Sequence, residues 1–150
     1  MISIVRLLND HTAMNWLKQL FTRAPKIDDP IFGTITLGKD SWLSLPDAAR
    51  PHLVILGGNA AGPSEQQRSQ YAEIIQRIDL LTDQSIEYLR SQPEYAESIG
   101  TSNLELHAII ITDGSAGKEL DFTLEFSPDQ DAIYGVNFVA GCAVDCYYDH

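Results

Sequence analysis

The fold of this chain is decided by residues 62–91, which read GPSEQQRSQYAEIIQRIDLLTDQSIEYLRS. Ser64 is a favourable N-cap residue, and Gln67 three positions later completes a capping box, in which each side chain bonds the backbone N–H of the other residue. Pro93 marks the far end of the segment, because a proline lacks the N–H group that would continue a helix. We therefore predict one long helix over residues 65–91.

Apolar residues recur along this segment at the spacing of one helix face. They are Tyr71, Ile74, Ile75, Ile78, Leu81, Ile86 and Leu89. Charged and amide side chains take the opposite side, namely Arg68, Glu73, Gln76, Arg77 and Asp83. Such a helix would be about 40 Å long at 1.5 Å per residue, which is enough to cross a whole sheet.

The segments on both sides of this helix show the alternation that is typical of β-strands. Before the helix we predict strands at residues 31–37, 41–45 and 52–56. After it we predict strands with period-two alternation at residues 104–110, 120–126, 134–140 and 142–148. Strands, one long helix and further hairpin-linked strands describe an α+β fold. We expect an antiparallel sheet of six to seven strands with the helix packed on its apolar face.

Residues 1–26 differ from the rest of the chain and are predicted to form an N-terminal extension with a net charge of +3. Apolar side chains within it fall at helical spacing and predict a short amphipathic helix. These are Trp16, Leu17, Leu20 and Phe21. Residues 26–30 have the composition of a linker, so we expect a single domain over residues 27–150. Translation from Met1 and translation from Met14 are both open.

Length and composition indicate one globular domain that needs neither a disulfide nor a structural metal, because the chain has 150 residues and is 44% hydrophobic. No stretch approaches the roughly 20 apolar residues of a membrane span, and the N-terminus lacks the pattern of a secretory signal peptide. Cys142 and Cys146 on one strand would lie roughly 13 Å apart, beyond disulfide reach. We expect a cytoplasmic protein with reduced thiols and no cofactor.

The net charge of −11 is concentrated in the last sixty residues, which hold eleven acidic residues and one basic residue. Such a surface repels phosphates and acidic lipids and attracts cationic partners, so we expect no nucleic acid partner. The predicted strands place part of this acidity on the sheet face that points away from the helix. The candidate binding residues on that face are Glu105, His107, Glu119, Asp121 and Glu125.

Two glycine-rich stretches and a cysteine pair have superficial features of functional motifs. Residues 57–62 lie between a strand and a helix, as phosphate loops do, but the Gly-Lys-Ser/Thr sequence is missing. Residues 114–118 join two strands, so a turn accounts for them. Cys142, Cys146 and His150 are too widely spaced along a strand to bind one metal ion. Buried core cysteines are the favoured interpretation, and we predict no metal site.

Three segments together resemble a known group of proteins. They are residues 14–21 (MNWLKQLF), residues 29–35 (DPIFGTI) with Trp42 on the strand that follows, and residues 62–66 (GPSEQ) before the helix. This order resembles small, acidic bacterial domains of unknown function, some of which are encoded near polymorphic toxins, where immunity-type proteins occur. The resemblance covers residues 14–126. Its motifs are structural, so it implies the α+β fold and an immunity-like role but no catalytic residue.

These features predict a non-enzymatic, acidic protein-binding domain, with neutralisation of a basic protein as its immunity-like form. The contact would be made by Glu105, Asp121 and Glu125. The alternative is an enzyme or a small-ligand-binding protein that uses His107, whose protonated form the neighbouring carboxylates would favour. A membrane contact through Trp16 and Phe21 is a third interpretation, disfavoured because the apolar face is only one and a half turns long.

Overall fold

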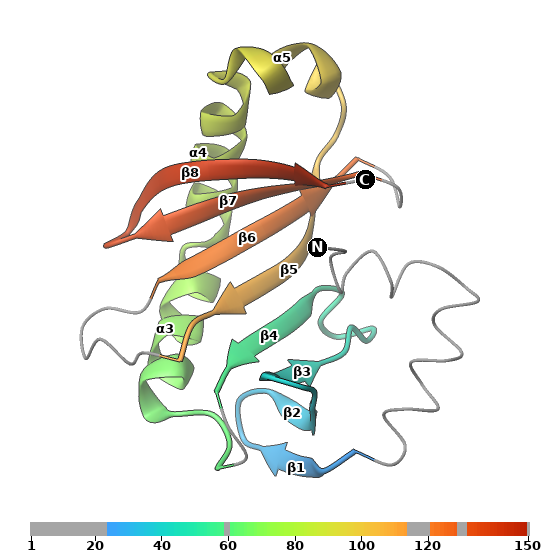
Figure 1. Cartoon of the computed structure of the whole chain (residues 1–150), viewed down its shortest axis with the longest axis vertical. Coiled ribbons are helices and arrows are strands. Elements are labelled where there is room, and N and C mark those ends of the chain that lie inside the picture. The colour runs from blue at the N-terminus through green and yellow to red at the C-terminus, as the bar shows by residue number, and fades with distance from the viewer. Residues whose placement is uncertain (1–23, 59–60, 114–120, 129–131, 150) are drawn as a thin grey trace.

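The computed structural model describes residues 24–58, 61–113, 121–128 and 132–149, which form one sheet covered on one face by helices (Figure 1). The strands are β1 Lys26–Asp29, β2 Gly33–Leu37, β3 Ser41–Ser44, β4 Leu53–Gly57, β5 Glu105–Ile111, β6 Phe122–Ser127, β7 Ile133–Val139 and β8 Cys142–Asp149. The helices are α3 Glu65–Gln76, α4 Ile78–Arg90 and α5 Pro93–Ile99. The predicted α+β class is confirmed. The predicted N-terminal amphipathic helix lies outside the described residues.

The strands lie in the sheet in the order in which they occur in the chain, from β1 to β8. Neighbouring strands are antiparallel except β4 and β5, which run parallel. A parallel pair needs a long connection that returns the chain to the starting end of the sheet, and α3, α4 and α5 provide it. The predicted antiparallel sheet is therefore confirmed for all described pairs but one. The described residues contain eight strands rather than six to seven.

The predicted capping box at the start of α3 is present. The Ser64 hydroxyl accepts a hydrogen bond from the Gln67 backbone N–H at 3.1 Å, and the Gln67 side-chain oxygen accepts one from the Ser64 backbone N–H at 3.0 Å. The Gln67 side chain is buried and also donates to the backbone oxygens of Gly57, at 2.6 Å, and Thr112, at 2.9 Å. One side chain thus joins the start of the helix to the ends of the parallel strands β4 and β5.

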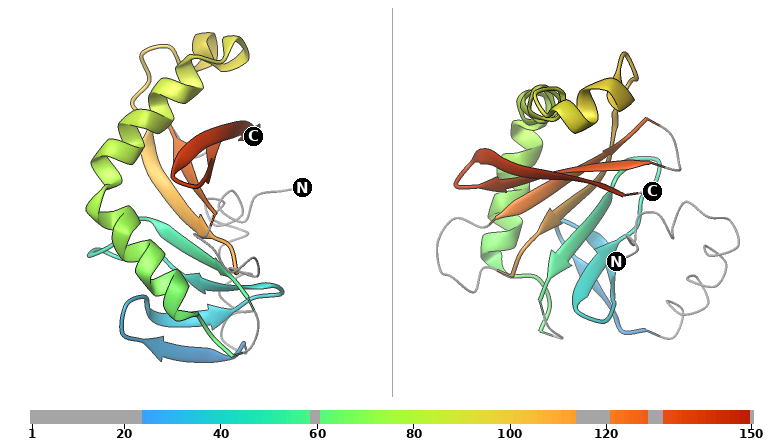
Figure 2. Two further views of the ribbon diagram at one scale, coloured as in Figure 1. Left: turned by 90° about the vertical axis from the view of Figure 1, so that its left-hand side faces the viewer. Right: turned by 45° about the horizontal axis from the view of Figure 1, so that its top comes forward.

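The prediction of one helix over residues 65–91 is wrong in its continuity, because the helix breaks at Arg77, where φ is −110° and ψ is 13°. The Arg77 N–H is shared between the carbonyls of Glu73 and Ile74. The two helices follow the curvature of the sheet (Figure 2), with α3 against β5 and α4 against β7 and β8. A sheet twists from strand to strand, so one straight helix would lift away from part of it.

Helix α5 falls in a segment for which the sequence predicts neither a helix nor a strand. Pro93 occupies the first turn, Ile99 is buried, and Gly100 with a φ of +51° ends the helix. The seven-residue helix turns few apolar side chains toward the core. Too few periodic positions are therefore present for a pattern to reveal it.

The core lies between the helices and one face of the sheet. The helices contribute Tyr71, Ile74, Leu81, Leu89 and Ile99, and the strands contribute mainly Trp42, Val54, Leu56, Ile109, Ile111, Leu124, Phe126, Val136 and Phe138. The rings of Phe122 and Phe138 stack with their centroids 4.7 Å apart. Burying each large apolar side chain is worth about 1.5–3 kcal/mol, so this layer is the main source of the stability of the fold.

A β-bulge in β5 changes which of its side chains face the helices. The register with β6 shifts between Leu106 and Ala108. One extra residue in a strand reverses the alternation of faces beyond it. Ile109 and Ile111 therefore join the core beneath the helices. The uninterrupted alternation predicted for residues 104–110 would have placed Leu104, Leu106, Ala108 and Ile110 on one face. The prediction is wrong for the second half of this strand.

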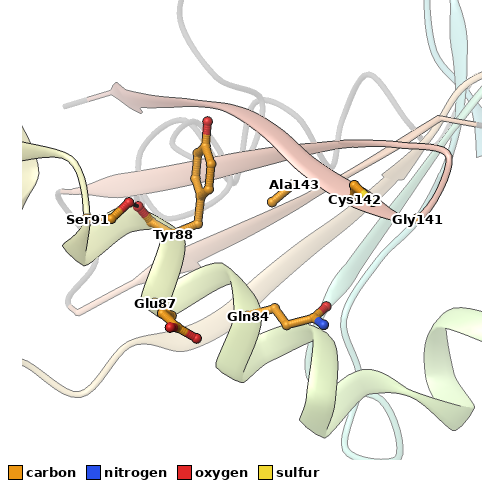
Figure 3. Close-up of a pocket in the computed structure, with 7 residues that line it drawn as sticks. All are labelled: Gln84, Glu87, Tyr88, Ser91, Gly141, Cys142 and Ala143. Atoms are coloured by element: carbon orange, nitrogen blue, oxygen red, sulfur yellow. Dashed lines mark hydrogen bonds between the residues drawn. The ribbon is translucent and has the colours of Figure 1, made fainter.

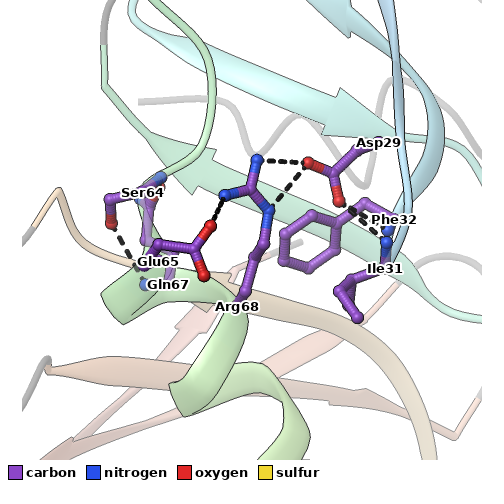
Figure 4. A network of polar contacts seen from close by, with 7 residues as sticks. All are labelled: Asp29, Ile31, Phe32, Ser64, Glu65, Gln67 and Arg68. Carbon is purple, nitrogen blue, oxygen red and sulfur yellow. Dashed lines mark hydrogen bonds and ion pairs between the residues drawn. The ribbon is translucent and has the colours of Figure 1, made fainter.

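Residues 26–30, predicted to be a linker, instead contain strand β1, which pairs with β2. Asp29 at its end is buried beneath α3 (Figure 4). One Asp29 oxygen accepts hydrogen bonds from Nε of Arg68 at 2.9 Å and from Nη2 at 2.7 Å. The other accepts the backbone N–H groups of Ile31 at 2.9 Å and Phe32 at 3.1 Å. This carboxylate fixes the edge of the sheet to the helix.

The contacts of Asp29 lead to a prediction about acid stability. Burial alone would raise the pKa of Asp29, but the hydrogen bonds from Arg68 and from two backbone N–H groups outweigh it and lower the pKa below its ordinary value. The carboxylate therefore stabilises the fold above its ordinary pKa, and this contribution is lost as the pH falls through the lowered value. We expect Asp29→Asn to reduce the free energy of unfolding by about 2 kcal/mol at neutral pH.

The measurement is urea unfolding between pH 7 and pH 2, with Asp28→Asn as the matched control. Asp28 precedes Asp29 on the same strand, is exposed, and accepts only a surface hydrogen bond from Thr34. The difference between wild type and Asp29→Asn should shrink below about pH 4. A difference that stays constant over the whole range would show that the charge of Asp29 is not what stabilises the fold.

Candidate functional site

The three described helices all lie on one face of the sheet, here called the first face (Figure 2). The opposite face, here called the second face, is also buried at its centre. Four apolar side chains are at most 1% exposed and lie outside the core beneath the helices: Leu43, Leu53, Ala108 and Ile133. Two polar residues of the same face, Glu125 and Ser127, are 3% and 2% exposed. The expectation that this whole face displays its acidic groups to solvent is wrong.

A row of five paired residues crosses this face from β4 to β8. Leu53 pairs with Ala108, Ala108 with Glu125, Glu125 with Gly135, and Gly135 with Tyr147. The Tyr147 ring lies directly over Gly135, because a Cβ atom at residue 135 would stand only 2.1 Å from Cζ of the ring. Glu125 thus lies between Ala108 and Gly135, the two smallest residues of the row. The ring of Tyr147 fills the space over Gly135.

Glu125 and Tyr147 form a buried polar pair. The Tyr147 hydroxyl donates a hydrogen bond to the Glu125 carboxylate. Burial, followed by the charge of Glu125 and this hydrogen bond, raises the pKa of Tyr147 far above its ordinary value. Tyr147 therefore acts as a permanent hydrogen-bond donor and not as an acid or base near neutral pH.

The acidic residues predicted to bind a partner differ in exposure and position, and their role in binding stays a prediction. Glu125 is buried, whereas Glu105 and Asp121 are exposed. Glu105 pairs with Ser127 at the far end of β6 from Asp121. Six residues of strand separate these two positions, or roughly 20 Å at 3.3 Å per residue. Glu119 lies outside the described residues.

His107 lies at the bulge of β5 and is half-buried. Burial lowers the pKa of His107 below its ordinary value, and the nearby charge of Glu105 opposes that shift without reversing it. The neighbouring carboxylates were expected to favour the protonated imidazole, but desolvation is the larger effect on the pKa of His107. The use of His107 in catalysis or ligand binding stays a prediction.

A polar cluster around Arg50 is not predicted by any pattern in the sequence. The Arg50 guanidinium donates to the Phe32 carbonyl at 3.0 Å and to the Ser44 hydroxyl. His52 Nε2 lies 3.2 Å from the Tyr71 hydroxyl. Burial and then the charge of Arg50 lower the pKa of His52 to about 4, so this histidine is neutral at physiological pH. The cluster anchors the β3–β4 loop to α3, and no local pattern reveals it because its members are far apart in the chain.

A hollow of about 420 Å³ lies between α4 and the start of β8 (Figure 3). Helix α4 lines it with Gln84, Glu87, Tyr88 and Ser91, and the sheet lines it with residues 141–143. Cys142 is exposed and Cys146 partly buried, and both are free thiols. The expectation of two buried core cysteines is therefore wrong for Cys142. A register shift leaves Val144 unpaired, so that Ala143 rather than Val144 packs against the core.

Strand β8 beside this hollow is the last strand of the sheet in the described part of the chain. Three exposed carboxylates lie along it, from Glu87 on α4, Glu94 on α5 and Asp145 on β8 itself. Burial raises the pKa of the Cys146 thiol, and the nearby charges of Asp145 and Glu94 raise it further. Val144 is 50% exposed on the same strand. The arrangement offers a strand edge, a shallow hollow and negative charge side by side.

Comparisons with known proteins do not identify the chain. It matches no family model, and searches of curated proteins and of solved structures return no match. The resemblance to small bacterial immunity-type domains stays a prediction, as does the cytoplasmic location. None of the described helices is long and apolar enough to cross a membrane. In the same residues, no group of three or more His, Cys, Asp and Glu side chains lies together as metal ligands would.

The contact between Gly135 and Tyr147 leads to a second prediction. Gly135→Ala should lower the free energy of unfolding by about 1–3 kcal/mol, because the added methyl group overlaps the ring and something must shift. The cost should persist in a Tyr147→Phe background, which keeps the ring, and should largely disappear in a Tyr147→Ala background, which removes it. Urea unfolding of the double-mutant cycles measures both. An equal cost in the alanine background would show that the ring is not what excludes a side chain at residue 135.

Proposed function

We propose that this protein is a binding module for a basic protein partner, and that an extended segment of the partner docks along β8 and the neighbouring hollow. The observation that carries this proposal is the position of β8 at the edge of the described sheet, beside an open hollow and between exposed carboxylates. Neutralisation of a basic protein is the specific form of this function that the resemblance implies. An enzyme or small-ligand protein that uses His107 is the alternative.

The backbone of β8 supports the docking mode. The strand has eight residues, and its last five, Asp145–Asp149, pair continuously with residues 133–137 of β7. An edge strand presents N–H and C=O groups to which another strand can bond. An added strand gains affinity from main-chain hydrogen bonds and specificity from pockets for alternate side chains. The α4–β8 hollow would take such a side chain at the start of the strand.

The charges along this edge support the choice of a basic partner. Glu87, Glu94 and Asp145 are exposed, and no salt bridge in the described residues neutralises them. Complementary charge speeds association and selects against partners of the same sign. The net charge of −11 adds to this selection and disfavours nucleic acids. A lysine- or arginine-rich extended segment therefore fits this edge best.

The test compares capture of basic proteins from a lysate of the native organism by wild type and by a triple variant, Glu87→Gln, Glu94→Gln and Asp145→Asn. We expect the wild type to retain a specific basic protein at low salt, and the triple variant to lose it. A second variant, Val144→Lys, leaves those acidic residues in place but adds a cation at the strand edge, which blocks strand addition. It should lose the same protein.

The matched control is a second triple variant, Asp40→Asn, Glu73→Gln and Glu105→Gln, which removes three exposed charges away from β8. It should retain the partner, because docking depends on local and not on total charge. If both triple variants lose the partner equally, capture depends only on the total negative charge of the protein and not on docking at β8. Retention by the Val144→Lys variant would exclude the strand edge as the contact.

A further inference from the structure

The second face of the sheet has a buried apolar centre that none of the described helices covers. Its apolar centre is formed by Leu43, Leu53, Ala108 and Ile133, each at most 1% exposed, and is extended by half-buried Ile55 and Ile110. Helices α3, α4 and α5 all lie on the opposite face (Figure 2). Apolar side chains are removed from water only where other groups cover them.

Among the stretches outside the described ranges, residues 1–23 are the longest and have the length to provide such a layer. Two shorter stretches, 114–120 and 129–131, also lie outside the described ranges. They join the ends of neighbouring antiparallel strands, which limits how far they can reach. The backbone oxygen of Pro25 accepts the N–H of Leu37 at 2.9 Å, which fixes the end of the N-terminal segment at the edge of the sheet.

The reach of this segment matches the width of the sheet. In helical form 23 residues extend about 35 Å, and seven spacings between eight strands amount to about 34 Å. Starting beside β1 and β2, the segment can therefore pass over the whole second face as far as β8.

The chemistry of the segment matches the face as well. Trp16, Leu17, Leu20 and Phe21 form one apolar side at helical spacing. Residues 1–23 carry the cations Arg6, Lys18 and Arg23 against a single acid, Asp10. The face they would meet carries the exposed carboxylate of Glu105, which pairs with Ser127 of that face. Apolar side chains and a negative charge are thus both present on the face that would meet this segment.

We propose that residues 1–23 dock on the second face of the sheet of the same chain, with the Trp16–Phe21 side turned toward the apolar side chains of β3, β4 and β5. The partner of this surface is therefore the N-terminal segment of the protein itself. The proposal is independent of the basic partner at β8.

The two tryptophans of the chain provide a direct test in the full-length protein. Trp42 is 1% exposed, so any tryptophan emission that a neutral quencher such as acrylamide reaches easily comes from Trp16. We expect no easily quenched component in the wild type, and a quenching constant for Trp16 several-fold below that of a synthetic peptide of residues 1–23. Leu20→Asp should release Trp16 to the peptide value, while far-UV circular dichroism shows that the sheet is retained.

The matched control is Asn15→Asp, which adds the same carboxylate on the opposite side of the predicted helix and should leave Trp16 protected. Peptide-like quenching of Trp16 in the wild type would overturn the proposal. Equal release by Asn15→Asp and Leu20→Asp would do so too, since docking would then have no preferred side. Protection that disappears on dilution would assign the cover to a second copy of the chain and would also overturn it.

Discussion

One buried amide, that of Gln67, holds the two halves of the molecule together. Strands β1–β4 and β5–β8 are each a run of antiparallel strands, and they meet only at the parallel pair β4 and β5. Just beyond the ends of that pair, the Gln67 side chain donates to Gly57 and to Thr112 while its oxygen completes the cap of α3. A buried amide with all these partners fixes sheet, crossover and helix at one point.

The start of α3 could be predicted because its determinants are local. Ser64 and Gln67 are three residues apart, and the hydrogen bonds between them need no other part of the chain. The break at Arg77 and the bulge beside Leu106 depend on distant partners. Arg77 interrupts the helix where the sheet beneath it twists away. Strand β1 forms by pairing with the adjacent β2, but the ion pair that buries Asp29 at its end needs Arg68, thirty-nine residues later. A residue pattern contains no information on such distances.

The same distinction separates what the sequence revealed of the candidate sites from what it did not. Alternation placed Glu125 on the correct face of β6, but whether that face is covered depends on segments elsewhere. The space that Gly135 leaves is used by Tyr147, twelve residues later on the next strand. The position of β8 at the edge of the described sheet follows from the order of the strands. Composition does not show which strand lies at an edge. Charge alone therefore favoured a cationic partner but indicated no particular strand for it to bind.

The sequential order of the strands also bears on how quickly the chain folds. Each described strand pairs with its neighbours in sequence, and the pairs joined by short connections form early at low entropic cost. The parallel pair is the exception, since Leu53 meets Ala108 fifty-five positions later. The loop between Leu53 and Ala108 closes only when the helices are folded and the two antiparallel halves, β1–β4 and β5–β8, are aligned. The joining of these two halves is therefore the step expected to limit the rate of folding. Sequence changes at the β4–β5 junction would alter that rate more than changes within either half.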